Sequence, residues 1–226
     1  MNRIARSGIA AAALWCASAA TAPEARATSL APLTIEQFTD SATWIVEGTV
    51  TRVWTELDDR GLVWTRAELD LDVVHKGPAS PDRLVIDSFG GIHGDVRTSI
   101  PAQAVYSEGE QIFAFLDVIR HGRRIVPSAK FMGKYTVRRA AHDTRKYALQ
   151  VHPSSRPGWK FDHRFLRHPS PEDRVYVDVL RSQVLARLDE GWDGEPIPGI
   201  SNERLAEING VDLPTETIAP GSEGLR

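Results

Sequence analysis

Apolar and polar residues alternate with a period of two along much of the chain between residues 44 and 137. This period predicts β-strands with one buried and one wet face, as in an antiparallel sheet. The segments together predict a mainly β fold, an antiparallel barrel of five or six strands. Long strands are expected over residues 44–50 and 65–77, and shorter ones over residues 83–87, 111–116 and 133–137.

Turn residues separate the predicted strands. Gly61 can take a positive φ in a turn over residues 56–61, and Gly122 serves a second hairpin. Residues 89–110 form a glycine-rich loop with at most one short strand, over residues 96–100. Neighbours in a strand point to opposite faces, so we expect core contacts from either Ile112 or Phe113, together with Val46, Val50, Leu69 and Leu71.

Helix signals flank the predicted sheet. Thr34 and Gln37 form a capping box for a short helix that ends near residue 40. Further on, Ser170 is followed by a proline and two acidic residues, which start a longer helix that Gly191 ends. The apolar stripe of this helix consists of Val175, Val179, Leu180, Val184 and Leu188.

Composition divides the chain into segments. Residues 148–171 hold four prolines with serine and glycine, which predicts a connector that crosses the surface instead of joining the sheet. Ser201 and Gly210 bound a last short helix. The expected order is a signal peptide (1–27), a barrel domain with a short N-terminal helix (28–147), the connector (148–171), a helical appendage (172–210) and a disordered tail (211–226).

The first 27 residues have the features of a secretory signal peptide. Two arginines precede an apolar run over residues 9–20, and small-residue cleavage sites end at Ala22 and Ala27. A membrane anchor needs about 20 apolar residues, and polar residues and a proline interrupt the run too soon. We therefore expect a secreted or periplasmic protein whose mature chain starts at residue 23 or 28.

The single cysteine raises a lipoprotein alternative, in which Cys16 would carry a lipid at the cleavage point. Trp15 argues against this alternative, because small residues are required just before such a cysteine. Cleavage at the expected sites removes Cys16, so the mature chain has no disulfide and no thiol nucleophile. The roughly 199 residues that remain suffice for one domain with its own core.

Five short motifs resemble an uncharacterised group of secreted bacterial proteins. They are Asp40-Ser-Ala-Thr-Trp-Ile-Val-Glu-Gly-Thr-Val, Val73-Val-His-Lys-Gly, Gly90-Gly, Gly109-Glu-Gln-Ile-Phe-Ala-Phe-Leu and Met132-Gly-Lys-Tyr-Thr-Val. That group in turn resembles the OB-fold barrel of netrin modules and tissue inhibitors of metalloproteinases. The resemblance implies an OB-like antiparallel barrel over about residues 34–139.

The resemblance implies a fold more than an activity. In the inhibitors an N-terminal cysteine chelates the protease zinc, and the mature chain has no cysteine. Some secreted bacterial relatives carry a zinc-protease domain, but this chain has no His-Glu-x-x-His motif. An inhibitor or accessory of a secreted protease is therefore only the alternative function.

Charge is distributed unevenly along the chain, whose formal net charge is −3. Residues 120–168 hold 13 Lys and Arg against two acidic residues, a local net charge of +11, with aromatic residues among them. A basic, aromatic strip beside an OB-like barrel suits an anionic polymer, because charge follows the polymer and rings stack on it. In the alternative interpretation these cations neutralise the acidic strands and C-terminal helix of the same molecule.

The strip supplies the predicted ligand-binding residues. The expected partner is an anionic polymer or an envelope component; nucleic acid is disfavoured because an exported protein rarely meets it. No catalytic residue, metal or cofactor is expected, since no catalytic motif is present. The ligand-binding residues are Arg123, Arg124, Lys134, Tyr135, Arg138 and Arg139.

Other sets of residues could bind a metal ion or a ligand, or act in catalysis, but each has a simpler structural explanation. Glu68, Asp70 and Asp72 line one strand face and suit Ca²⁺ or acid–base catalysis, yet such carboxylates usually face solvent opposite Arg or Lys. His163 and His168 are zinc-ligand types, but their spacing places them on different helical faces. The glycines from residue 90 indicate turns. The sequence thus predicts an exported, non-enzymatic binding module, monomeric or weakly associated.

Overall fold

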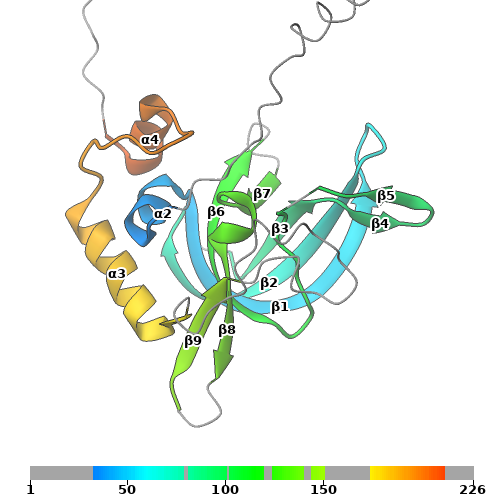
Figure 1. Cartoon of the computed structure of the whole chain (residues 1–226), viewed down its shortest axis with the longest axis horizontal. Coiled ribbons are helices and arrows are strands. Elements are labelled where there is room, and N and C mark those ends of the chain that lie inside the picture. Colours follow the sequence, from blue (N-terminus) through cyan, green and yellow to red (C-terminus); the bar gives the residue numbers. More distant parts are fainter. Residues whose placement is uncertain are drawn as a thin grey trace, which may run out of the picture. The chain divides into compact units, whose positions relative to one another are not determined.

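The computed structural model describes residues 33–78, 81–100, 102–119, 124–139, 144–150 and 174–211, which belong to one compact unit. The fold is mainly β and its sheet is antiparallel, as predicted (Figure 1). Its strands are β1 (Trp44–Leu57), β2 (Val63–Lys76), β3 (Arg83–Phe89), β4 (Gly91–His93), β5 (Val96–Thr98), β6 (Gln111–Ile119), β7 (Arg124–Pro127), β8 (Lys134–Arg139), β9 (Lys146–Gln150) and β10 (Arg174–Tyr176). Its helices are α2 (Ile35–Ser41), α3 (Val177–Glu190) and α4 (Asn202–Asn209), with a 3₁₀ turn, η2 (Lys130–Gly133).

Eight of the described strands form one sheet, in the order β10-β9-β8-β6-β1-β2-β3, and β7 pairs with β6 beside β8. β1 and β2 form its long central hairpin, and Figure 1 shows them curving together. The turn that joins them confirms the prediction: Gly61 has a φ of +72°, and Asp58 accepts the amide hydrogens of Arg60 and Leu62.

β1 and β2 approach each other most closely at Gly48. A Cβ at this position would lie 2.2 Å from the carbonyl oxygen of Asp70, a separation at which atoms clash. The pairing register also shifts between Glu47 and Gly48, and such irregularities increase the local bend and twist of a strand. Glycine is therefore required where the hairpin begins to curve.

Both faces of β6 are buried. Ile112 belongs to the main core between the curved strands, whereas Phe113 and Phe115 point to the opposite face. There Phe115 packs against Phe38 of α2, with ring centroids 5.2 Å apart. The predicted opposition of Ile112 and Phe113 is confirmed, and both are buried because helices cover the second face. Of the other predicted core residues, Val46, Val50 and Leu69 are fully buried, and Leu71 is partly buried against the same cluster.

The sheet is not closed into a barrel. β7 lies next to β3, and Arg124 of β7 donates a hydrogen bond of 2.8 Å to Asp87 of β3. Within the described part of the chain, however, no backbone ladder joins β3 to β7. The contact between these two strands is made by the Arg124 and Asp87 side chains.

The helices lie together on one side of the sheet, at the left in Figure 1. The predicted capping box of α2 is present: the Thr34 hydroxyl accepts the amide hydrogen of Gln37, and the Gln37 side chain accepts that of Thr34. Arg187 of α3 binds both carboxylate oxygens of Asp40, at 2.7 and 2.9 Å. Helices α3 and α4 end at Gly191 and Gly210, as the sequence predicts.

Three predictions about secondary structure were wrong. Residues 174–176 form strand β10, so α3 begins at Val177 and its buried stripe is Val177, Leu180 and Val184, while Val179 is exposed. Residues 148–150 belong to β9 and join the sheet. The glycine-rich loop holds a hairpin, β4–β5, instead of a single strand. In each case short strands found cross-strand partners that local composition does not reveal.

The predicted signal peptide, residues 151–171 of the connector, and residues 212–226 of the tail lie outside the described residues. None of the described helices combines the length and the apolar character needed to cross a membrane.

Candidate functional site

The six residues predicted to bind a ligand do not form one surface. Of the five that the structure describes, Lys134 and Tyr135 are buried, each 6% exposed. Arg124 is half-buried, whereas Arg138 and Arg139 are exposed at the end of β8. The sixth residue, Arg123, lies outside the described residues.

Arg124 binds acidic residues of its own chain. Its guanidinium lies 2.8 Å from Asp87 and 3.5 Å from Glu56, and stacks 4.2 Å above the ring of Trp64. Arg66 Nε lies 3.1 Å from the same Asp87 oxygen, an ion pair by distance but without hydrogen-bond alignment. Burial raises the pKa of Asp87, and the two arginines oppose this rise. Arg124 thus neutralises a buried acid.

Lys134 is also paired internally. Its Nζ lies 2.6 Å from Glu110 Oε1 and donates to the carbonyl oxygen of Val105 at 2.7 Å. The Thr136 hydroxyl donates to the same Glu110 oxygen. Neighbouring Tyr135 packs its ring against Phe115. For Arg124 and Lys134, therefore, the alternative interpretation holds: these cations of the basic strip neutralise acidic residues of the same molecule.

The strand carboxylates have the cross-strand partner that the sequence suggests. Arg83 of β3 stands opposite Asp70; its Nε lies 3.0 Å from Asp70 and its Nη1 3.4 Å from Glu68. The Asp70 contact is close enough for an ion pair but lacks hydrogen-bond alignment. Asp72 is exposed. Within the described ranges, no three histidine, cysteine or acidic side chains converge on a point where a metal could bind.

Exposed cations gather instead around β8, β9 and β10, and three arginines share one face of these strands. Arg138 stands opposite Tyr147, and Tyr147 stands opposite Tyr176. Directly opposed residues of antiparallel strands share a face, so these three side chains form a row. Arg174, two residues before Tyr176, joins the same face. We call Arg138, Arg145, Tyr147, Arg174 and Tyr176 the arginine–tyrosine face.

Two arginines of this face lie over tyrosine rings. The Arg145 guanidinium is 3.6 Å from the centre of the Tyr176 ring, and that of Arg174 is 5.1 Å from the centre of the Tyr147 ring. Arg145 Nη2 donates to both carboxylate oxygens of Asp178, at 2.9 and 2.8 Å. That hydrogen bond lowers the pKa of Asp178. Stacking on a ring holds the guanidinium plane in place for such contacts.

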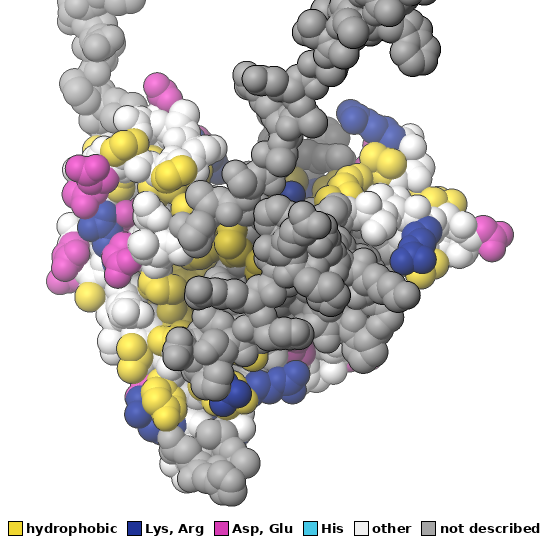
Figure 2. Space-filling model, viewed as in Figure 1, with side chains coloured by type: hydrophobic (Ala, Val, Ile, Leu, Met, Phe, Trp, Pro, Cys, Tyr) yellow, Lys and Arg dark blue, Asp and Glu magenta, His cyan; other side chains and the backbone are white. Residues whose placement is uncertain are grey.

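The other arginines here have no acidic partner within the described part of the chain. Arg138, Arg139 and Arg174 form no ion pair with any acidic side chain in the described ranges. Arg139 stands opposite Lys146, which adds a further exposed cation at the same end of the hairpin. Figure 2 shows Lys and Arg side chains at this lower end of the molecule, over β8 and β9. The positive charge is therefore available to a ligand.

Sequence reasoning missed Arg174 as a site residue because it placed residues 174–176 near a helix start. The alternation in Arg174-Val-Tyr, which matches the strand period, was the available signal. Tyr147 belonged to the aromatic residues of the basic strip but lay just before the predicted connector. Both become part of the site through the pairing of β9 with β8 and β10.

A buried ionic cluster also escaped prediction. His75 Nε2 lies 2.9 Å from Glu47 Oε1, and Arg181 of α3 binds both oxygens of the same carboxylate, at 2.6 and 2.8 Å. Burial opposes ionisation of Glu47, but the hydrogen bonds from His75 and Arg181 outweigh it and lower its pKa to about 2. The His75 ring also stacks on Phe113. The cluster fastens α3 to the sheet.

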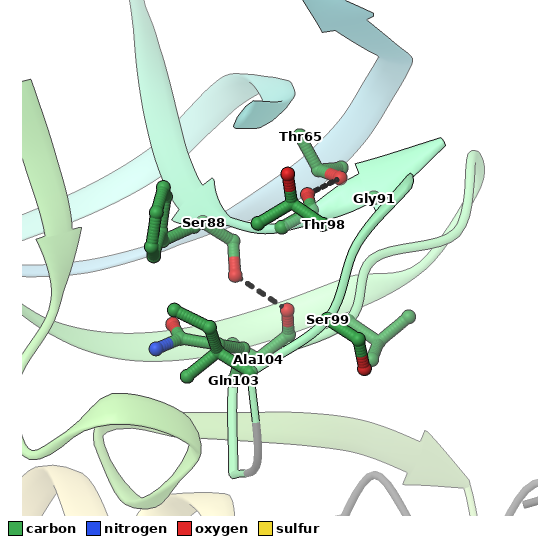
Figure 3. Close-up of a pocket in the computed structure, with 11 residues that line it drawn as sticks. Thr65, Ser88, Gly91, Thr98, Ser99, Gln103 and Ala104 are labelled. Carbon is green, nitrogen blue, oxygen red and sulfur yellow. Dashed lines mark hydrogen bonds between the residues drawn. The ribbon is translucent and has the colours of Figure 1, made fainter. Parts of the chain in front are cut away.

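A small cavity of about 160 Å³ lies where the β4–β5 hairpin leaves the sheet (Figure 3). Two of the hydroxyls that line it donate to backbone carbonyls: Thr65 to that of Gly90, and Ser88 to that of Ala104. Gly90, between β3 and β4, and Gly91, the first residue of β4, have φ of +107° and +138°. Gly94, with a φ of +56°, lies in the β4–β5 turn, as the sequence predicts for a glycine of this segment. No polar group in this cavity identifies a ligand.

Comparison with known protein families finds no match to this chain, and comparison with curated protein sequences finds none either.

Proposed function

We propose that this chain is an exported binding module that holds an anionic polymer on its arginine–tyrosine face. The observation that carries the proposal is the exposure of Arg138 and Arg174 on this face, and of Arg139 beside them at the end of β8, each without an acidic partner among the described residues. Neighbouring strands lie about 4.8 Å apart, and β9 separates β8 from β10, so the charges are spread over a surface. A polymer can contact the whole of this surface at once, which a small anion cannot do.

The proposal includes an OB-like barrel. Strands β3, β2, β1, β6 and β7 follow one another in this order around the curved sheet, and the Arg124–Asp87 ion pair joins β7 to β3. A five-stranded, partly open barrel is the architecture of OB folds, which commonly bind extended polymers. Export is supported by the basic residues, apolar run and small-residue sites of the first 27 residues.

Binding to dextran sulfate over a series of salt concentrations tests this function. The double variant Arg138→Gln/Arg139→Gln should lower the affinity at least fivefold and make its salt dependence shallower, because each neutralised anion releases counterions. Its unfolding midpoint in urea should not change, because neither arginine is paired with an acidic side chain of the residues that the structure describes.

The matched control is Arg60→Gln/Arg97→Gln, which removes the same charge from the β1–β2 turn and the β4–β5 hairpin, where both arginines are exposed. This control should bind almost as the wild type does, since the local field and not the net charge governs such encounters. Equal losses in the two double variants, or no binding by the wild type, would refute the proposed site.

A further inference from the structure

We infer that Arg138 and Arg174, on either side of Tyr147, bind a carboxylate group of an acidic polysaccharide. The inference rests on the proposed function and names the class of polymer. Arg138 lies on β8 and Arg174 on β10, the two strands that flank Tyr147 of β9. Both side chains are exposed, and neither forms an ion pair with a described acidic residue.

The neighbouring unit of the same face shows how such a group is held. Arg145 stacks on Tyr176 and binds the carboxylate of Asp178 through one nitrogen, at 2.8 and 2.9 Å. Arg174 also lies over a tyrosine ring, that of Tyr147, but farther from its centre, at 5.1 Å, and no described carboxylate is bound to it. In the Arg145–Tyr176 pair, the arginine thus binds a carboxylate of its own chain. The Arg174–Tyr147 pair beside it offers a guanidinium to the carboxylate of a ligand.

The stacking also argues against nucleic acid as the ligand. Single-stranded nucleic acid gains much of its affinity from bases that stack on bare aromatic rings. In this face a guanidinium lies over each of the two rings, at 3.6 and 5.1 Å from their centres. The rings position arginines, and the arginines present N–H groups suited to carboxylates. A polyuronate supplies carboxylates in series without any need for stacking.

Three polymers of matched charge number separate the alternatives: an oligogalacturonate, dextran sulfate and oligo(dT). Binding is measured by calorimetry at one fixed low ionic strength. We expect the oligogalacturonate to bind at least tenfold more tightly than oligo(dT), and at least as tightly as dextran sulfate.

Two variants and one control test the arginine–tyrosine pairs of this face. Arg174→Lys keeps the charge but loses the planar guanidinium, and should lower the oligogalacturonate affinity at least fivefold with an unchanged urea midpoint. Asp178→Asn removes a negative charge from the arginine–tyrosine face and should raise the affinity severalfold. Asp189→Asn, which removes the same charge from an exposed position of the same helix, should raise it much less.

The outcomes distinguish this inference from the function on which it rests. Oligo(dT) or dextran sulfate binding more tightly than the oligogalacturonate overturns the inference, as does an Arg174→Lys variant that binds normally. In those cases the proposed function stands if Arg138→Gln/Arg139→Gln still weakens polymer binding. If none of the three polymers binds, or that double variant binds as the wild type does, the function and the inference both fall.

Discussion

Arg124 of β7 lies 2.8 Å from Asp87 of β3 and joins two strands that share no backbone ladder among the described residues. The Asp87 side chain is only 2% exposed and that of Arg124 14%, so the pair is shielded from water. Arg66 and Glu56 extend it into a four-residue cluster. In a closed barrel, backbone hydrogen bonds would join these two strands. Here the ion pairs of this cluster join β3 to β7 instead, at the open edge of the curved sheet.

Replacing Arg124 with Gln should destabilise the fold by about 3 kcal/mol, because it leaves the buried Asp87 with one ill-aligned arginine. Urea denaturation monitored by tryptophan fluorescence measures the loss. Arg83→Gln is the control: Arg83 is 65% exposed, and an exposed pair contributes at most about 1 kcal/mol. Similar losses in both variants would show that the seam does not depend on the Arg124–Asp87 pair.

Glu47 should make the protein sensitive to acid. Its pKa is lowered from 4.5 to about 2 in the folded state, so its stabilisation is complete above the unfolded value and is lost as the pH falls through about 2. The free energy of unfolding should drop by up to about 3 kcal/mol between pH 5 and 2 from this group. In Glu47→Gln this drop should be absent, and an unchanged pH profile of the variant would contradict the assignment.

The strand register predicts that two leucines of β2 contribute differently to the stability of the fold. Leu69 is fully buried, whereas Leu71 is only partly buried against the same cluster. Leu69→Ala should cost about 2–5 kcal/mol, since it removes a large side chain and leaves a cavity. Leu71→Ala should cost less, because part of its surface is already in water. Equilibrium denaturation compares the two, and the reverse order would mean that the register is shifted.

Export makes a prediction about the mature N-terminus. Expressed with its first 27 residues in a secretion-competent bacterium, the protein should be recovered outside the cytoplasm. Its first residue should then be Pro23 or Thr28. N-terminal sequencing of the purified protein decides the point. A soluble cytoplasmic form that retains Met1 would remove the basis for an exported function.

The sequence alone determined the local elements whose signals lie within a few residues. The capping box of Thr34 and Gln37, the turn at Gly61 and the helix ends at Gly191 and Gly210 were all predictable, because each depends on φ angles or on hydrogen bonds to nearby backbone. The alternation that places Val46, Val50 and Leu69 in the core was equally visible. These features need no knowledge of distant partners.

The sites were decided by the tertiary structure. Along the chain Lys134 and Arg138 look alike, two cations in one basic strip, but Lys134 meets Glu110 in the interior while Arg138 lies at the exposed end of β8. Arg174 reaches Tyr147 only because β10 pairs with β9. Charge neutralisation and strand pairing act between residues far apart in sequence, so composition showed where positive charge is concentrated and folding determined which cations face a ligand.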